Sequence, residues 1–131
     1  MTFQILQHTA DIRLHVRAES VEELFLDAMR GMFAIMIATP DEGARRHSVR
    51  IAFDAVDRTS LLIDFLSEVL SRAHIDRAMF DDIAFERLTR TEIAATVSGF
   101  TPARFEQDVK AVTYHEADVE DSLETMIVFD I

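Results

Sequence analysis

The chain has 131 residues and a net charge of -11, with 24 acidic side chains against 13 basic ones. This length fits one domain, which we expect to span residues 1–131 and to bury a hydrophobic core without disulfides. Cysteine is absent, which excludes thiolate zinc sites and cysteine nucleophiles. We see no signal peptide, and no apolar stretch approaches the roughly 20 residues of a membrane span. We therefore expect a cytoplasmic protein without a membrane partner.

The acidic surplus also bears on partners. Nucleic-acid binding relies on Lys and Arg to displace counterions from phosphate, and the only adjacent basic pair is Arg45-Arg46. The charge therefore argues against direct nucleic-acid binding and favours a basic protein or cations as partners. Only 3 glycines are present, and neither a P-loop nor a G-x-G-x-x-G motif occurs, which argues against a conventional nucleotide site.

The N-terminal third reads as a strand, a helix and a loop. Apolar and polar residues alternate over residues 12–18, which predicts a strand with one solvated face. Ser20 and Glu23 form a capping box that predicts a helix start. The apolar stripe of that helix consists of Val21, Leu24, Phe25, Ala28, Met29, Met32, Phe33 and Met36. Pro40, within residues 39–43, predicts a loop.

The remainder predicts a second helix among several strands. Residues 48–55 alternate as a strand, and a helix follows from near Asp57 or Thr59. We expect a hairpin of strands at residues 80–88 and 92–99, and extended segments at residues 109–119 and 123–131. Hairpin-length gaps between these segments predict an α+β fold: a largely antiparallel sheet with two main helices packed on it.

Two acidic positions are candidates for a metal site. Asp11 closes the sequence His8-Thr9-Ala10-Asp11, at the start of a predicted strand. Asp130 precedes Ile131, whose α-carboxylate we expect to be free. Three carboxylates together would form a hard oxygen site for Ca²⁺, Mg²⁺ or Mn²⁺. Spacing alone favours a plainer alternative, in which Asp11 caps a turn and Asp130 is solvated.

A third candidate lies near the C-terminus. Lys110, Thr113 and His115 are polar groups that could take part in acid–base chemistry. The plainer alternative, which we favour for catalysis, is an amphipathic strand. In that strand Val112 and Tyr114 face the core, and Thr113 and His115 face the other way.

These motifs, in this order, resemble the archease family. The opening His8–Asp11, followed by Glu23-Leu24-Phe25 and Gly31-Met32, is similar to the start of archeases. Residues 109–115, Val-Lys-Ala-Val-Thr-Tyr-His, resemble a second family signature, and residues 128–131, Val-Phe-Asp-Ile, resemble a third. The middle of the chain matches only in its pattern of elements.

The resemblance implies an α+β protein without its own catalytic activity. It implies a partner, the RtcB-type RNA ligase of tRNA splicing and RNA repair, whose GTP- and Mn²⁺-dependent guanylylation and multiple turnover the protein would promote. It also implies that Asp11, Asp130 and Ile131 bind the metal, and it leaves His8, Lys110, Thr113 and His115 as further functional candidates. One departure is that Leu123 or Thr125 stands where we expect an aromatic residue.

Two other functions compete with ligase activation. The first is a chaperone-like, acidic protein-interaction module whose metal is only structural. The second, which has less support, is a small metal-dependent hydrolase, for which His115 would be the best candidate base.

Overall fold

The computed structural model describes residues 11–131, which form two helices and six strands. The elements, in chain order, are β1 (Asp11–Arg17), α1 (Val21–Ile35), β2 (Thr39–Asp54), α2 (Arg58–Asp76), β3 (Met79–Leu88), β4 (Glu92–Arg104), β5 (Ala111–Thr113) and β6 (Glu124–Asp130). The strands form two antiparallel sheets of three strands each, with the orders β1-β6-β5 and β2-β4-β3.

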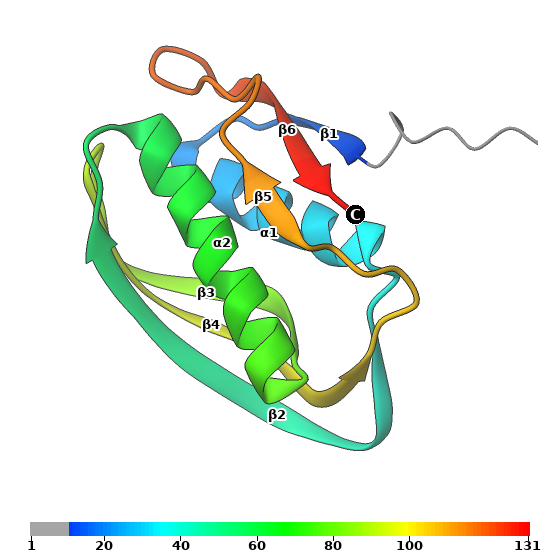
Figure 1. The fold of residues 1–131 in the computed structure, drawn as a ribbon. Helices are drawn as coiled ribbons and strands as arrows, with labels where there is room; N and C mark the ends of the chain where they lie inside the picture. The colour runs from blue at the N-terminus through cyan, green and yellow to red at the C-terminus, as the bar shows by residue number, and fades with distance from the viewer. Residues whose placement is uncertain (1–10) are drawn as a thin grey trace, which may run out of the picture.

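The two helices lie between the two sheets (Figure 1). Helix α1 contacts β1 of one sheet and β3 of the other, and α2 contacts β5 on one side and β2, β3 and β4 on the other. The predicted α+β class, the antiparallel pairing and the two packed helices are confirmed, with the strands divided between two sheets. No helix within residues 11–131 is long and apolar enough to cross a membrane.

Helix α1 begins where its capping box predicts. The Ser20 hydroxyl accepts a hydrogen bond from the Glu23 N–H at 3.1 Å. The predicted apolar stripe is packed in the core. A Cβ atom on Gly31 would lie only 2.5 Å from Leu14 Cδ2 of β1. The absence of a side chain at Gly31 therefore lets α1 pack closely against the β1-β6-β5 sheet.

Helix α2 has two caps at its N-terminus. Asp57, one of the two predicted start positions, accepts a hydrogen bond from the Ser60 N–H at 2.7 Å. Glu120, distant in sequence, accepts from the N–H groups of Thr59 at 2.7 Å and Arg58 at 3.3 Å. These contacts satisfy N–H groups that have no partner within the helix. They also fasten the turn before β6 to the start of α2.

Glu120→Gln is expected to remove a pH-dependent part of the stability. The hydrogen bond from the Thr59 hydroxyl, followed by that from its N–H, lowers the pKa of Glu120 below its ordinary value of 4.5. The folded state therefore favours the carboxylate, and this stabilisation is present above the ordinary pKa and is lost as the pH falls through the lower, folded pKa. Thermal melts of both proteins between pH 7 and pH 3 would test this.

The unsubstituted protein should melt higher at pH 7, and the difference should shrink as the pH falls. The matched control is Glu106→Gln, since Glu106 is exposed and only its backbone, not its carboxylate, bonds to a helix end. A difference between wild type and Glu120→Gln that stays constant with pH would contradict the capping role.

The loop predicted around Pro40 is wrong. Residues 39–43 belong to β2, which runs from Thr39 to Asp54. The register against β4 shifts between Pro40 and Arg45, and Gly43 has a φ of +78°. Because β2 is an edge strand, a proline and a bulge can be accommodated without breaking the sheet.

The prediction of an extended segment over residues 109–119 is mostly wrong. Strand β5 covers only Ala111–Thr113, and the chain then turns. Val112 is buried as predicted, but Tyr114 is 58% exposed rather than in the core. Its hydroxyl donates to the Asp64 carboxylate of α2. This hydrogen bond, followed by burial and the carboxylate charge, raises the pKa of Tyr114.

Thr125, in the region where the resemblance led us to expect an aromatic residue, is buried on the core side of β6. Its hydroxyl accepts a hydrogen bond from the Asp118 N–H at 3.0 Å. The polar side chain therefore anchors the turn that precedes β6.

Candidate functional site

Asp11 and Asp130 lie directly opposite each other at one corner of the β1-β6-β5 sheet. They form the first cross-strand pair of the antiparallel β1–β6 ladder. Leu14 and Val16 lie on the face of β1 that packs against the core, whereas Arg13 lies on the outer face and is exposed. Asp11 and Asp130 share this outer face, where directly paired residues have Cβ atoms about 4.5–5.5 Å apart.

Two carboxylates paired in this way repel each other unless a cation lies close. The guanidinium of Arg13 supplies a counter-charge, with its Nη1 atom 3.8 Å from Asp11 Oδ1. However, Arg13 Nε donates to Glu116 Oε2 at 2.8 Å, and this contact is the main cause that raises the pKa of Arg13. Arg13 is therefore shared between two carboxylates, and the corner keeps an excess of negative charge.

The end of β6 is held from both sides. On the side of β1 it pairs through Asp11, and on the side of β5 it pairs through Ala111. The Lys110 N–H donates to the Asp130 carbonyl at 2.7 Å. Ile131, directly after the strand, is partly buried. The backbone that carries the Asp130 carboxylate and leads to Ile131 is therefore fixed by two neighbouring strands.

The other functional candidates lie at different distances from the corner formed by Asp11 and Asp130. Thr113 pairs with Val128, which lies two residues before Asp130 on the same outer face of the sheet. His115 is exposed in the following turn, where its N–H approaches Thr113 Oγ1 at 3.3 Å. Lys110 lines a groove against Ser71 and His74 of α2. His8 lies outside the described residues.

The donor set of the corner suits a hard cation. Within residues 11–131, no three His, Asp or Glu side chains are close enough together to hold a metal ion. Asp11 and Asp130 supply two carboxylates, and Ca²⁺, Mg²⁺ and Mn²⁺ readily complete their coordination with further carboxylate or carbonyl oxygens and water. A metal here would therefore need the Ile131 carboxylate, backbone oxygens or water beside the two aspartates.

Two contacts near the site were not predicted from the sequence. Arg13 lies on the solvated face of the strand predicted at residues 12–18, and its spacing of two from Asp11 places both residues on one face. Its contact with Glu116 joins β1 to the turn after β5, and no local pattern could have predicted a pair so far apart in the chain.

Comparisons with known proteins agree on one family. The sequence model of the Archease protein family (MTH1598/TM1083) matches residues 3–131. The archease of Methanosarcina mazei is 33% identical over 126 residues, covering 90% of this chain and 86% of the relative. The archease of Methanopyrus kandleri is 32% identical over 127 residues, covering 92% and 90%.

Solved structures show the same fold. A crystal structure from Thermotoga maritima, described as an archease and possible chaperone, superposes with a TM-score of 0.70 at 19% identity, covering 100% of this chain and 98% of that one. The solution structure of Methanobacterium thermoautotrophicum protein 1598 gives 0.68 at 23% identity, covering 98% and 96%. By the match of the family model along nearly its whole length, this chain belongs to the archease family.

Proposed function

We propose that this protein is a non-catalytic, cytoplasmic activator of an RtcB-type RNA ligase. In this proposal it promotes the GTP- and Mn²⁺-dependent guanylylation of the ligase and supports multiple turnover in tRNA splicing or RNA repair. Asp11, Asp130 and the carboxylate of Ile131 would bind a divalent metal ion.

The observation that carries the proposal is the Asp11–Asp130 cross-strand pair. Two unlike parts of the sequence, each resembling an archease signature, meet at one corner and place two acids on the same outer face. The arrangement is electrostatically unfavourable without a cation. A bound divalent metal ion would relieve this repulsion, and this supports the proposal.

The surrounding residues define what the protein itself would do. The metal would supply positive charge and open coordination positions for oxygen ligands. Backbone hydrogen bonding from Lys110 orients the Asp130 main chain, and Arg13 holds Glu116 beside the corner. With a net charge of -11, the protein would be drawn toward a basic region of the ligase. Direct contact with RNA is not part of the proposal.

The experiment is guanylylation of a competent RtcB-type ligase with GTP and Mn²⁺, with and without this protein at sub-stoichiometric concentration. We expect a large acceleration, which Asp11→Ala or Asp130→Ala removes. A control is Asp121→Ala, because the Asp121 side chain is almost fully exposed and its nearest cation, Arg90, lies 4.0 Å away. No acceleration with the unsubstituted protein would refute the activator function.

A second function is a chaperone-like protein-interaction module. The description of the Thermotoga maritima structure as a possible chaperone favours it, as does the acidic turn at residues 116–121. The same assay separates the two functions. If ligase behaviour improves equally with Asp130→Ala but is lost in the pair Asp118→Asn with Asp121→Asn, which leaves the Arg13 contact and the cap of α2 in place, the surface charge is responsible and the metal corner is not.

A further inference from the structure

The free edge of β2 lies beside a groove on the opposite side of the helices from the metal corner. Strand β4 pairs with one edge of β2, and within the described residues 11–131 no strand pairs with the other. The ladder from Arg45 to Asp54 runs without a register shift. The proline and the bulge, which are common means of protecting an edge from pairing, lie before this stretch.

The hydrogen-bonding groups of this edge can be assigned from the ladder. The Ala55 N–H donates to the Thr91 carbonyl at 2.8 Å, next to the pair Asp54–Glu92. Because hydrogen-bonded and non-bonded pairs alternate in an antiparallel ladder, odd-numbered residues of β2 bond to β4. The backbone groups of Ser48, Arg50 and Ala52 therefore point outward, and all three residues are exposed.

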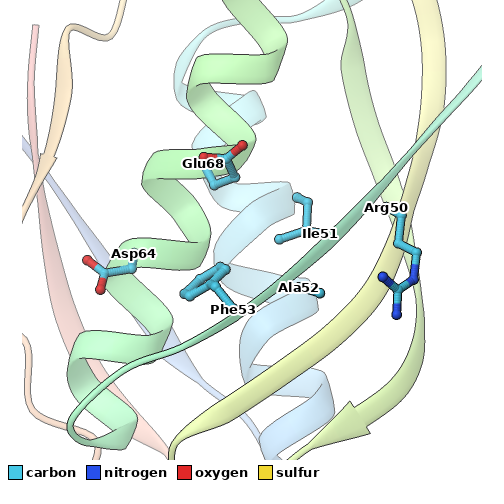
Figure 2. Close-up of a pocket in the computed structure, with 6 residues that line it drawn as sticks. All are labelled: Arg50, Ile51, Ala52, Phe53, Asp64 and Glu68. Carbon is cyan, nitrogen blue, oxygen red and sulfur yellow. The ribbon is translucent and has the colours of Figure 1, made fainter.

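A pocket of about 380 Å³ lies between this edge and α2 (Figure 2). Ile51 and Phe53 form its apolar side and project toward the helix, whereas Arg50 projects to the other face of the sheet. Glu68 and Asp64 line it from α2, and the Asp64 carboxylate also accepts the Tyr114 hydroxyl. The pocket thus combines unpaired strand backbone, an apolar floor and an acidic wall.

Arg50 and Arg46 of β2 do not neutralise the carboxylates of Asp64 and Glu68. Arg50 lies on the opposite face of the sheet, where its guanidinium forms two hydrogen bonds with Glu86 of β3 at 3.0 and 3.1 Å. Arg46 stacks over the Phe100 ring, 4.8 Å from its centre, and approaches Asp81. The face toward α2 is therefore acidic beside Ile51 and Phe53.

We propose that the edge of β2 binds an extended, basic polypeptide segment as a fourth strand of the β2-β4-β3 sheet, antiparallel to β2. Main-chain hydrogen bonds to residues 48–52 would supply affinity, and side chains at alternate positions would supply specificity. Lys or Arg facing α2 would lay aliphatic stems over Ile51 and Phe53 and place charges near Glu68 and Asp64. Alternate residues of a strand are about 6.8 Å apart, close to the about 6 Å rise between residues 64 and 68 on the helix.

A second copy of this chain is a poorer occupant of the same edge. Its β2 would bring a second set of arginines and a second acidic α2 against the first, and each chain carries a net charge of -11. Like charges across a strand pair are destabilising. The proposal is independent of the metal corner, so the two can fail separately.

The test is fluorescence anisotropy with a labelled peptide of about ten residues in which Lys and Thr alternate. We expect saturable binding that weakens at least about tenfold, or about 1.4 kcal/mol, when every Thr is N-methylated. Methylation keeps the peptide charge but removes the N–H groups that would face β2. Equal binding of both peptides would mean charge attraction only, and would overturn strand addition.

Protein variants locate the site. Ala52→Pro removes an outward N–H without touching the ladder to β4, and it should weaken binding while circular dichroism confirms the fold. The pair Asp64→Asn with Glu68→Gln should weaken binding more than the charge-matched pair Glu106→Gln with Asp121→Asn. Equal effects of the two pairs would overturn the site. A third result would also overturn the proposal. In it, the peptide does not bind at any concentration, and sedimentation shows a dimer of this chain that Ala52→Pro dissociates.

Discussion

Asp130→Asn is expected to bind Mn²⁺ or Ca²⁺ at least about 100-fold more weakly than the unsubstituted protein. The substitution keeps the size of the side chain but removes one of the two charges that meet at the β1–β6 corner. Changes to residues that only support metal ligands cost about 10- to 100-fold in affinity, so loss of a charged ligand should cost at least as much. Titration calorimetry with each metal measures the effect.

The matched control for this substitution is Glu124→Gln. Glu124 lies at the opposite end of the same strand and on the same outer face, where it contacts His15 at 2.6 Å. Both variants lose one negative charge, so a purely electrostatic effect of net charge would appear in both. Unchanged metal affinity in Asp130→Asn, or equal weakening in the two variants, would exclude the corner as the metal site.

Gly99→Ala is expected to destabilise the fold by at least about 3 kcal/mol, the upper end of the usual cost of overpacking. A Cβ atom at Gly99 would lie 1.8 Å from the Met79 carbonyl oxygen and 2.7 Å from Phe80 Cα. Both atoms are backbone, so no rotation of a side chain can relieve the overlap. Strand β4 is the centre of its sheet, and displacing β3 would disturb the layer under α1.

Urea unfolding of Gly99→Ala and of Ser98→Ala, its neighbour on the same strand, measures this cost. A second comparison is Gly43→Ala, since Gly43 has a positive φ but no atom within 4 Å of an added Cβ. Gly43→Ala therefore reports backbone conformation alone, and Gly99→Ala reports steric overlap. If the free energy of unfolding of Gly99→Ala lies within about 1 kcal/mol of that of the unsubstituted protein, β3 can move aside. Domains have total stabilities of about 5–15 kcal/mol, so urea unfolding can resolve a loss of about 3 kcal/mol.

Much of the fold could be predicted because its signals are local. Ser20 with Glu23 and the acid at residue 57 mark the two helix starts, and alternation marks β1, β4 and the part of β2 from residue 48. The errors lie where tertiary context decides. Pro40 is a loop signal in isolation, but an edge strand can accommodate it. Tyr114 has strand propensity, but its hydroxyl is bonded to a helix 50 residues earlier in the chain.

The candidate site was predictable only in part. Asp11 and Asp130 could be named because recurring family signatures mark them, whereas their direct pairing depends on which strands become neighbours. Nothing in the sequence shows that β6 lies between β1 and β5, nor that Arg13 reaches Glu116. The β2 edge was missed for the same reason, since an unpaired edge is a property of the sheet order.

The β1–β6 register also determines where the family can tolerate changes in length. One residue inserted within β6 would turn Asp130 toward the core and Phe129 toward solvent, because successive residues of a strand face opposite ways. One residue inserted in the turn between Thr113 and Glu124 would leave that alternation untouched. Insertions and deletions that accumulate during evolution should therefore gather in this turn, while the distance in sequence from Thr125 to Asp130 stays constant.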